Sequence, residues 1–498
     1  MDFLTATYRP TSTGRTARAF WLALANFVSF SATLVIASCL SRLLSPADYG
    51  TYRQVILVYY TFLMVFSMGL PKAYSYFLAK APVEEGRSIV LKFGRILLAL
   101  ALFFSIALWC GADVMAWLLG NDMLAPHLRC FALTPLFLMP VLGVEGILTA
   151  YGMTNLVAAY VFAGRVLLIA GAVIPVAWFG AGVTGAVNGF VIASFASCVF
   201  GVWLSFRPFK GIGSCKTEIK IKDVFKFVWP IFTSGIYGFV IMSSSQFFVS
   251  HFFGVKEFAF FANGYHELPF AGMIFGATAG VLLPEYSKMV SESDSSARMR
   301  ALWKSVVIKT CLLIYPMSVY CCFFASEIMA FLYGADYRLA AVLFIIATVV
   351  CLLRVVPFNP VMLATGNAKR FSDLHLATAL MIIVLDVLCV NYFPSLFAIA
   401  VIGSGCIMYC QLMLMCSVAR TFGITLRRLM PWRFMLKILV LSIIAGFFAR
   451  GVTSMWHMTD VFPILVISSV VFLLVYFPLA MWRKLDYSWV LSLRRTSH

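Results

Sequence analysis

The chain has 498 residues, of which 62% are hydrophobic and only 12% are charged. Soluble globular proteins carry about 25% charged residues, so lipid must be the solvent for most of this chain. This composition excludes soluble enzymes and disordered proteins. The net charge of +18 would suggest nucleic-acid binding in a soluble protein, so the positions of the cations decide between that function and membrane topology.

Apolar runs of about 20 residues predict about fourteen membrane-spanning helices. In chain order they cover 19–40, 54–78, 93–112, 128–149, 157–178, 184–205, 228–250, 263–284, 305–325, 340–363, 374–392, 396–417, 434–450 and 461–482. The connections between them are short, so no sizeable extramembrane domain is expected. The predicted fold is an all-α polytopic membrane protein.

Placing both termini in the cytosol puts most Lys and Arg residues on the cytosolic side, as the positive-inside rule requires. The charge excess is therefore mainly a topology signal, and no nucleic-acid partner is expected. The predicted organisation is a cytosolic tail (1–18), an N-lobe (19–210), a cytosolic linker (211–227), a C-lobe (228–420), two further spans (421–482) and a cytosolic tail (483–498).

Motifs for a metal, a cofactor or catalysis are weak. Nearly all of the 13 cysteines fall in predicted spans, and no Cys/His spacing indicates a metal site. The match to GxGxxG at 180–185 lies in a turn between two spans, where it does not indicate a dinucleotide site. Enzymes usually place acid, His or Arg clusters on a larger loop than any expected here, so we predict no enzyme and no cofactor.

Three short matches indicate an internal duplication. Residues 48–52 (DYGTY) resemble 257–261 (EFAFF), residues 70–75 (LPKAYS) resemble 283–287 (LPEYS), and 150–152 (AYG) resemble 364–366 (ATG). The matches keep their order at a nearly constant offset. Because six is even, two six-span copies have the same orientation and form a parallel repeat, with substrate between the halves. The two last spans are then an addition outside the duplicated core.

The first of these motifs has a physical interpretation of its own. Ser45 can cap a helix, Pro46 suits the first helical position, and Asp48 lies near the positive end of the helix dipole. We expect a short interfacial helix here, on the outer face after the first span.

These features resemble a known family. The stretch 43–52 (LLSPADYGTY), its weaker copy after Gly254 and the Pro-terminated second and eighth spans are similar to the polysaccharide-type flippases of the multidrug/oligosaccharidyl-lipid/polysaccharide exporter superfamily. The resemblance implies a two-lobed, fourteen-helix protein of the bacterial inner membrane. It also implies that undecaprenyl-diphosphate-linked oligosaccharide is carried to the outer face, with a polymerase or ligase of the same pathway as partner. We expect the transporter to be monomeric.

Ionisable residues within spans are the candidate functional residues, because a charge in hydrocarbon normally faces a cavity or a partner. The candidate substrate-binding cations are Lys72, Arg165 and Arg354, with Arg53 on the outer flank of the second span. The candidate ion-coupling acids are Glu145, Glu267 and Asp386.

Each candidate also has a structural alternative. Lys72 is close enough to the interface to extend into it, and Arg165 could pair with Glu145. Glu267 and Asp386 could bond to Tyr and Ser neighbours instead of binding an ion. Among the many possible sugar contacts are Asn188, Gln246 and Gln411.

The leading functional hypothesis is a flippase for a lipid-linked glycan, and the alternative is a cation-coupled drug antiporter of the same superfamily. In the antiporter, acids should dominate the cavity because the cargo is cationic. The spans hold equal numbers of cations and acids, so charge alone does not decide, and the motif at 45–52 favours the flippase.

Arg354 lies well inside the predicted span 340–363, just before Pro357 and Pro360. We therefore expect Arg354→Ala to abolish surface-polysaccharide export while the protein is still expressed in the membrane. Export assays beside immunoblots of the membrane fraction test this expectation. Full export by the variant would remove Arg354 from the site.

Overall fold

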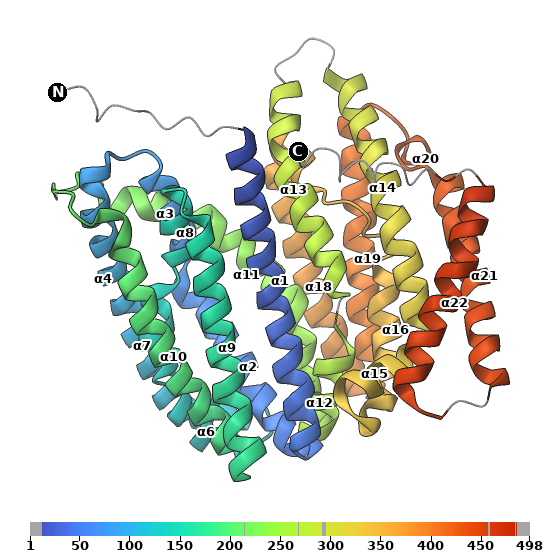
Figure 1. Ribbon diagram of the computed structural model, residues 1–498, viewed down its shortest axis with the longest axis horizontal. Helices are drawn as coiled ribbons and strands as arrows, with labels where there is room; N and C mark the ends of the chain where they lie inside the picture. Colours follow the sequence, from blue (N-terminus) through green and yellow to red (C-terminus); the bar gives the residue numbers. More distant parts are fainter. Residues whose placement is uncertain are drawn as a thin grey trace.

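The computed structural model describes residues 12–213, 215–266, 268–290, 295–456, 459–483 and 485. Within these ranges every regular element is a helix, as the composition predicts. Figure 1 shows the helices running side by side in two groups, with α1 between them. We call the side on which α1 begins the N side, and the side on which α2 begins the far side.

The first group is the N-lobe, which contains the first repeat. Its elements are α1 Ser12–Leu43, α2 Pro46–Ser67, α3 Leu70–Leu78, α4 Val83–Cys110, α5 Ala112–Leu118, α6 Leu124–Phe131, α7 Thr134–Leu138, η1 Met139–Val141, α8 Val144–Ala150, α9 Thr154–Phe179, α10 Gly182–Phe206 and η2 Arg207–Phe209.

The second group is the C-lobe, which contains the second repeat and is followed by two more long helices. Its elements are α11 Ile221–Phe253, α12 Val255–Gly264, α13 Pro269–Val290, α14 Ser295–Phe323, α15 Ala325–Tyr333, η3 Ala335–Ala340, α16 Ala341–Val350, α17 Asn359–Ala364, α18 Ala368–Tyr392 and α19 Leu396–Thr421. Helices α20 Leu426–Leu429, α21 Trp432–Met455 and α22 Val461–Trp482 complete the described chain.

Fewer helices meet the length and hydropathy expected of a membrane span than the sequence predicts. Among the described residues, eleven helices are long and apolar enough to cross a membrane, and counting the pair α2–α3, bent by 43°, as one span raises this number to twelve. The other two predicted spans fall on α12–α13 and on α16–α17, both of which are interrupted. The predicted count of fourteen is therefore not confirmed.

The interruption between α16 and α17 runs from Cys351 to Phe358 and includes Pro357. Backbone carbonyls freed by such a break need new donors inside a membrane. One of them, the carbonyl of Leu352, accepts a hydrogen bond from the Tyr315 hydroxyl at 2.7 Å. Arg354 lies in this break.

The prediction of a short interfacial helix after the first span is wrong. The cap itself is confirmed, because the Ser45 hydroxyl accepts a hydrogen bond from the Asp48 amide at 3.1 Å and Pro46 occupies the first turn. The helix that starts there continues to Ser67, because no residue breaks it before the left-handed pair Met68 and Gly69. The motif is thus the first turn of the second span.

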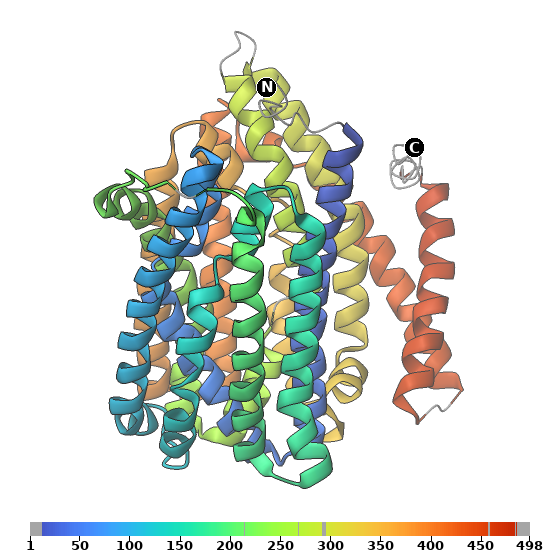
Figure 2. The ribbon, with the colours of Figure 1, turned by 60° about the vertical axis from the view of Figure 1, so that its left-hand side comes forward.

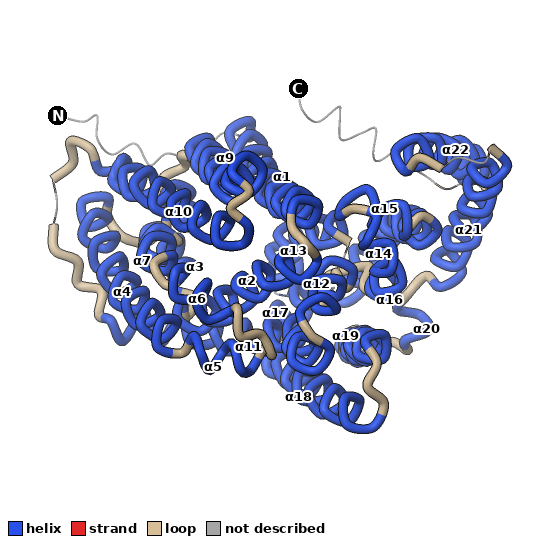
Figure 3. The backbone as a smooth tube through the Cα atoms, turned by 90° about the horizontal axis from the view of Figure 1, so that it is seen from below, coloured by secondary structure: helices blue, strands red, loops and turns tan. Residues whose placement is uncertain are grey.

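The two copies of this motif pack against each other on the far side, where α2 meets α12 between the lobes (Figure 3). Gly50 permits the close approach, since a Cβ there would collide with the Val255 carbonyl and lie 2.7 Å from its Cγ1 atom. Tyr49 donates a buried hydrogen bond to the side-chain oxygen of Asn263 at 2.8 Å. The duplicated sequence therefore builds a contact between the two lobes.

A buried polar network supports this contact. Gln54 donates to the Ser250 hydroxyl at 2.7 Å and accepts from the Asn121 side chain at 2.6 Å. Ser250 in turn donates to the carbonyl of Leu119 at 2.9 Å. Because each buried group has a partner in the other lobe or in the turn after α5, separating the lobes here leaves several polar groups unpaired.

Helices α21 and α22 stand at the outer edge of the C-lobe (Figure 2) and are attached to it by polar contacts. On α14, the Tyr320 hydroxyl lies 3.0 Å from that of Ser468 on α22. At the far side, Arg450 on α21 forms an ion pair with Glu327 on α15 at 2.5 Å. These contacts fix the added pair to the C-lobe.

Replacing Gly50 tests the close approach of α2 and α12. Gly50→Val should lower the thermal unfolding midpoint of the detergent-solubilised protein, because overpacking typically costs about 1–3 kcal/mol. Gly405→Val is the matched control, since no atom lies within 4 Å of a Cβ at this helical glycine. Equal midpoints for the two variants would show that the Gly50 contact does not hold the lobes together.

Candidate functional site

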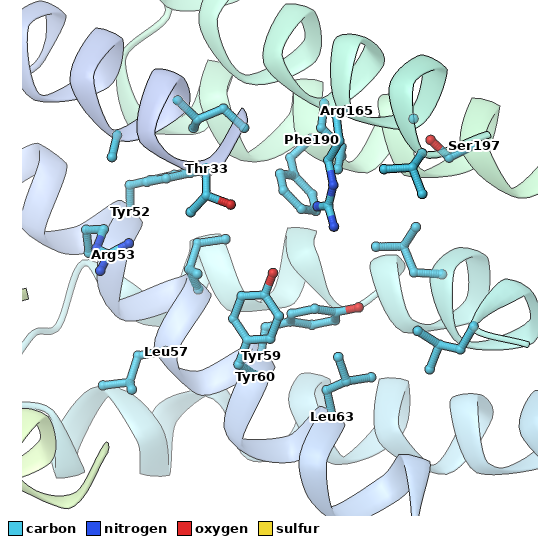
Figure 4. A pocket seen from close by; sticks show the side chains of 18 of the residues that line it. Thr33, Tyr52, Arg53, Leu57, Tyr59, Tyr60, Leu63, Arg165, Phe190 and Ser197 are labelled. Carbon is cyan, nitrogen blue, oxygen red and sulfur yellow. The ribbon is translucent and has the colours of Figure 1, made fainter. Parts of the chain in front are cut away.

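A cavity of about 470 Å³ lies between the lobes (Figure 4). Helices α1, α2, α8, α9 and α10 of the N-lobe form most of its wall, and α11 contributes one side. Its polar and charged lining residues are Thr33, Tyr49, Tyr52, Arg53, Tyr59, Tyr60, Glu145, Tyr160, Arg165, Ser197, Ser243, Gln246 and His266. The described lining thus holds two arginines and one acid.

Arg53 lies at the end of the cavity that adjoins the α2–α12 contact. One guanidinium nitrogen donates to the carbonyl of Ala262 at 3.2 Å, which ties the side chain to the C-lobe. Its Nε atom is buried and has no hydrogen-bond partner among the described residues. A buried donor of this kind has unused capacity for an acceptor.

Arg165 and Glu145 line the same cavity from α9 and α8. Arg165 donates from Nε to the Ser29 hydroxyl on α1 at 3.3 Å. Among the residues that the structure describes, no ion pair within 4.0 Å joins Arg165 to Glu145. The structure brings these two candidates together without a direct salt bridge, so both keep capacity for a ligand.

Tyrosines form the wall of α2 that faces these charges. Tyr59 is only 2% exposed, whereas Tyr60 is 50% exposed. Figure 4 shows both on α2, with Arg165 extending toward them from the opposite wall. The four tyrosines at 49, 52, 59 and 60 are a sequence signal that could have pointed to this wall, and our sequence analysis missed it.

The other predicted cations lie elsewhere. Lys72 is exposed on α3 and does not line the cavity. Arg354 lies in the C-lobe, in the break between α16 and α17, with its guanidinium carbon 5.1 Å from the centroid of the Phe275 ring. Neither joins Arg53 and Arg165, so the predicted cations do not form one cluster.

The remaining acids differ in position. Glu267 lies outside the described residues. Asp386 on α18 is fully buried within the C-lobe and accepts a hydrogen bond from the Ser245 hydroxyl of α11 at 2.8 Å. Its other carboxyl oxygen is buried without a hydrogen-bond partner among the described residues. Of the predicted sugar contacts, Gln246 lines the cavity, whereas Asn188 and Gln411 do not.

The arrangement suits a ligand that is anionic at one point and rich in hydroxyl groups elsewhere. Arginines form strong, directional hydrogen bonds with phosphate oxygens, and the low dielectric of a membrane interior strengthens them. Tyrosine rings and hydroxyls offer apolar faces and hydrogen bonds side by side. A cavity between two lobes is the arrangement in which two-lobed membrane transporters hold their substrate.

Comparison with known proteins identifies the family. Residues 39–342 match the family model described as "Polysaccharide biosynthesis protein", so the chain belongs to this family. No curated protein matches the chain.

Several solved structures have the same fold. The chain is similar to "Lipid II flippase MurJ, inward closed conformation", with 16% identity, a TM-score of 0.68 and coverage of 94% of this chain and 99% of that chain. A MATE family transporter of the MOP superfamily in an inward-facing conformation gives 14% identity, a TM-score of 0.64 and coverage of 82% and 98%. A MOP superfamily transporter from Pyrococcus furiosus gives 15% identity, a TM-score of 0.61 and coverage of 83% of this chain and 97% of that chain. The predicted superfamily fold is thereby confirmed.

Proposed function

We propose that this protein is a flippase that moves undecaprenyl-diphosphate-linked oligosaccharide from the cytosolic to the outer face of the bacterial inner membrane. The product would feed the synthesis of O-antigen, exopolysaccharide or capsule. The observation that carries the proposal is the cavity between the lobes, in which Arg53 and Arg165 accompany a wall of tyrosines. The arginines would bind the diphosphate, and the hydroxyl-bearing side chains would bind the glycan.

The architecture supports transport by alternating access. The contact of α2 with α12 lies beside the Arg53 end of the cavity, so release on the far side would require this contact to open. In the proposed orientation both termini are cytosolic and the far side is the outer face. The chain would act as a monomeric transporter, not as an enzyme, and a polymerase or ligase of the same pathway would use its product.

The alternative, a cation-coupled drug antiporter, fits the cavity less well. A cationic cargo requires acids in the cavity. The described lining contains Glu145 as its one acid beside two arginines. The charge balance within the cavity, unlike that of all spans together, therefore favours an anionic ligand.

Gene deletion and complementation test the proposal. Deletion should cause undecaprenyl-linked oligosaccharide to accumulate on the cytosolic side, because the lipid can no longer cross. Wild-type protein should relieve the accumulation, and Arg165→Ala should restore less than about a tenth of the flux, since losing a charged hydrogen bond costs about 1.5–3 kcal/mol. The measurement is the lipid-linked oligosaccharide pool, quantified by mass spectrometry.

Arg129→Ala is the matched control, because Arg129 forms a solvent-exposed pair with Asp113 outside the cavity. It should complement fully. Unchanged lipid-linked pools after deletion, together with altered drug resistance, would favour the antiporter instead.

We further propose that Asp386 couples transport to a cation or proton. A buried carboxyl with one unpartnered oxygen can hold a small cation or a proton at low structural cost. Asp386→Asn keeps the shape and the acceptor for Ser245 but removes the charge. In proteoliposomes the variant should lose most of the stimulation by an imposed Na⁺ or proton gradient, and equal stimulation of variant and wild type would exclude this role.

A further inference from the structure

We infer that Tyr60 and Glu145 form a subsite for a pyranose ring, the sugar attached to the diphosphate of the proposed substrate. This inference rests on the proposed function and adds the position at which the first sugar is recognised. The two side chains belong to different walls of the same cavity, Tyr60 to α2 and Glu145 to α8.

Tyr60 offers an exposed aromatic face in a fixed orientation. Half of its surface is accessible, although it lies in the middle of α2. The Tyr59 ring packs edge-on against it at 5.5 Å, and Tyr59 itself is stacked on Phe104 at 5.6 Å and edge-on to Phe131 at 5.3 Å. Such a braced ring is preorganised to stack against the C–H face of a pyranose, which lowers the entropy cost of binding.

Glu145 supplies hydrogen-bond acceptors. Its side chain is exposed to the cavity, and in the part of the chain that the structure describes its carboxylate has no hydrogen-bond or ion-pair partner. A carboxylate would repel a diphosphate placed against it, so its natural ligands are donors. Neighbouring sugar hydroxyls are such donors, and a carboxylate can accept two of them at once.

The spacing along α2 leaves room for both parts of the ligand. Arg53 and Tyr60 are separated by two helical turns, or about 10 Å along the axis. This distance accommodates a diphosphate at Arg53 and one sugar ring at Tyr60. On the opposite wall, Arg165 extends toward Tyr59 and Tyr60 (Figure 4), and Glu145 lines the same cavity from α8. On α11, Ser243 and Gln246 add uncharged polar groups.

Binding of two lipids to the full-length protein in nanodiscs tests the subsite. The probes are undecaprenyl diphosphate without sugar and undecaprenyl diphosphate carrying one glucose. Wild type should bind the glycosylated lipid about tenfold more tightly, a difference of about 1.4 kcal/mol. Tyr60→Ala should abolish this preference and Tyr60→Phe should retain it, because the ring and not the hydroxyl stacks on the sugar. Glu145→Gln should reduce the preference.

The affinity for the sugar-free lipid serves as the internal control for folding. It should stay unchanged in the two Tyr60 variants and should not fall in Glu145→Gln, which removes a negative charge from the cavity. Tyr392→Ala, which removes a 71% exposed tyrosine outside the cavity, is the matched control and should keep the preference. A preserved preference in Tyr60→Ala, or a wild type that binds both lipids equally, would overturn the subsite while leaving the proposed function intact. A wild type that binds neither lipid would overturn both.

Discussion

The close contact of α2 with α12 is the constraint on which the rest of the structure depends. Gly50 brings the two backbones together, and the buried Tyr49–Asn263 hydrogen bond fixes their register. The same helical turns place Arg53 against the carbonyl of Ala262 and so set one end of the cavity. Since the two helices carry the two copies of one motif, the duplicated sequence element forms both sides of this contact.

The cavity is unequally shared between the two repeats. Both of its arginines and its described acid come from the N-lobe, whereas α11 of the C-lobe contributes Ser243 and Gln246. The C-lobe adds His266 to the lining but keeps Arg354 and Asp386 out of it. After duplication the N-lobe therefore carries the charges that face the cavity, and the C-lobe holds its buried acid apart from them. Direct electrostatic interference between a bound anion and that acid is thereby reduced.

Local sequence features predicted structure more successfully than the depth of a charged residue within a span predicted its place in the cavity. The Ser45 cap follows from side-chain chemistry over four residues and was correct, whereas the end of its helix depends on the Met68–Gly69 conformation, which no short pattern announces. Arg165, Glu145 and Arg53 do line the cavity, yet Lys72 and Arg354 do not. Hydropathy reports that a charge is embedded, but the rotation of its helix decides which space it faces. The role of each candidate stays a prediction.

The attachment of α21 and α22 makes the two lobes mechanically unequal. The Arg450–Glu327 ion pair and the contact between Tyr320 and Ser468 oblige the pair to travel with the C-lobe. A body with more helices facing lipid meets more viscous resistance when it tilts. Any rocking about the α2–α12 joint would then displace the N-lobe more than the C-lobe in the frame of the membrane. The charged wall of the cavity would then move relative to the membrane, while the C-lobe would stay nearly fixed in it.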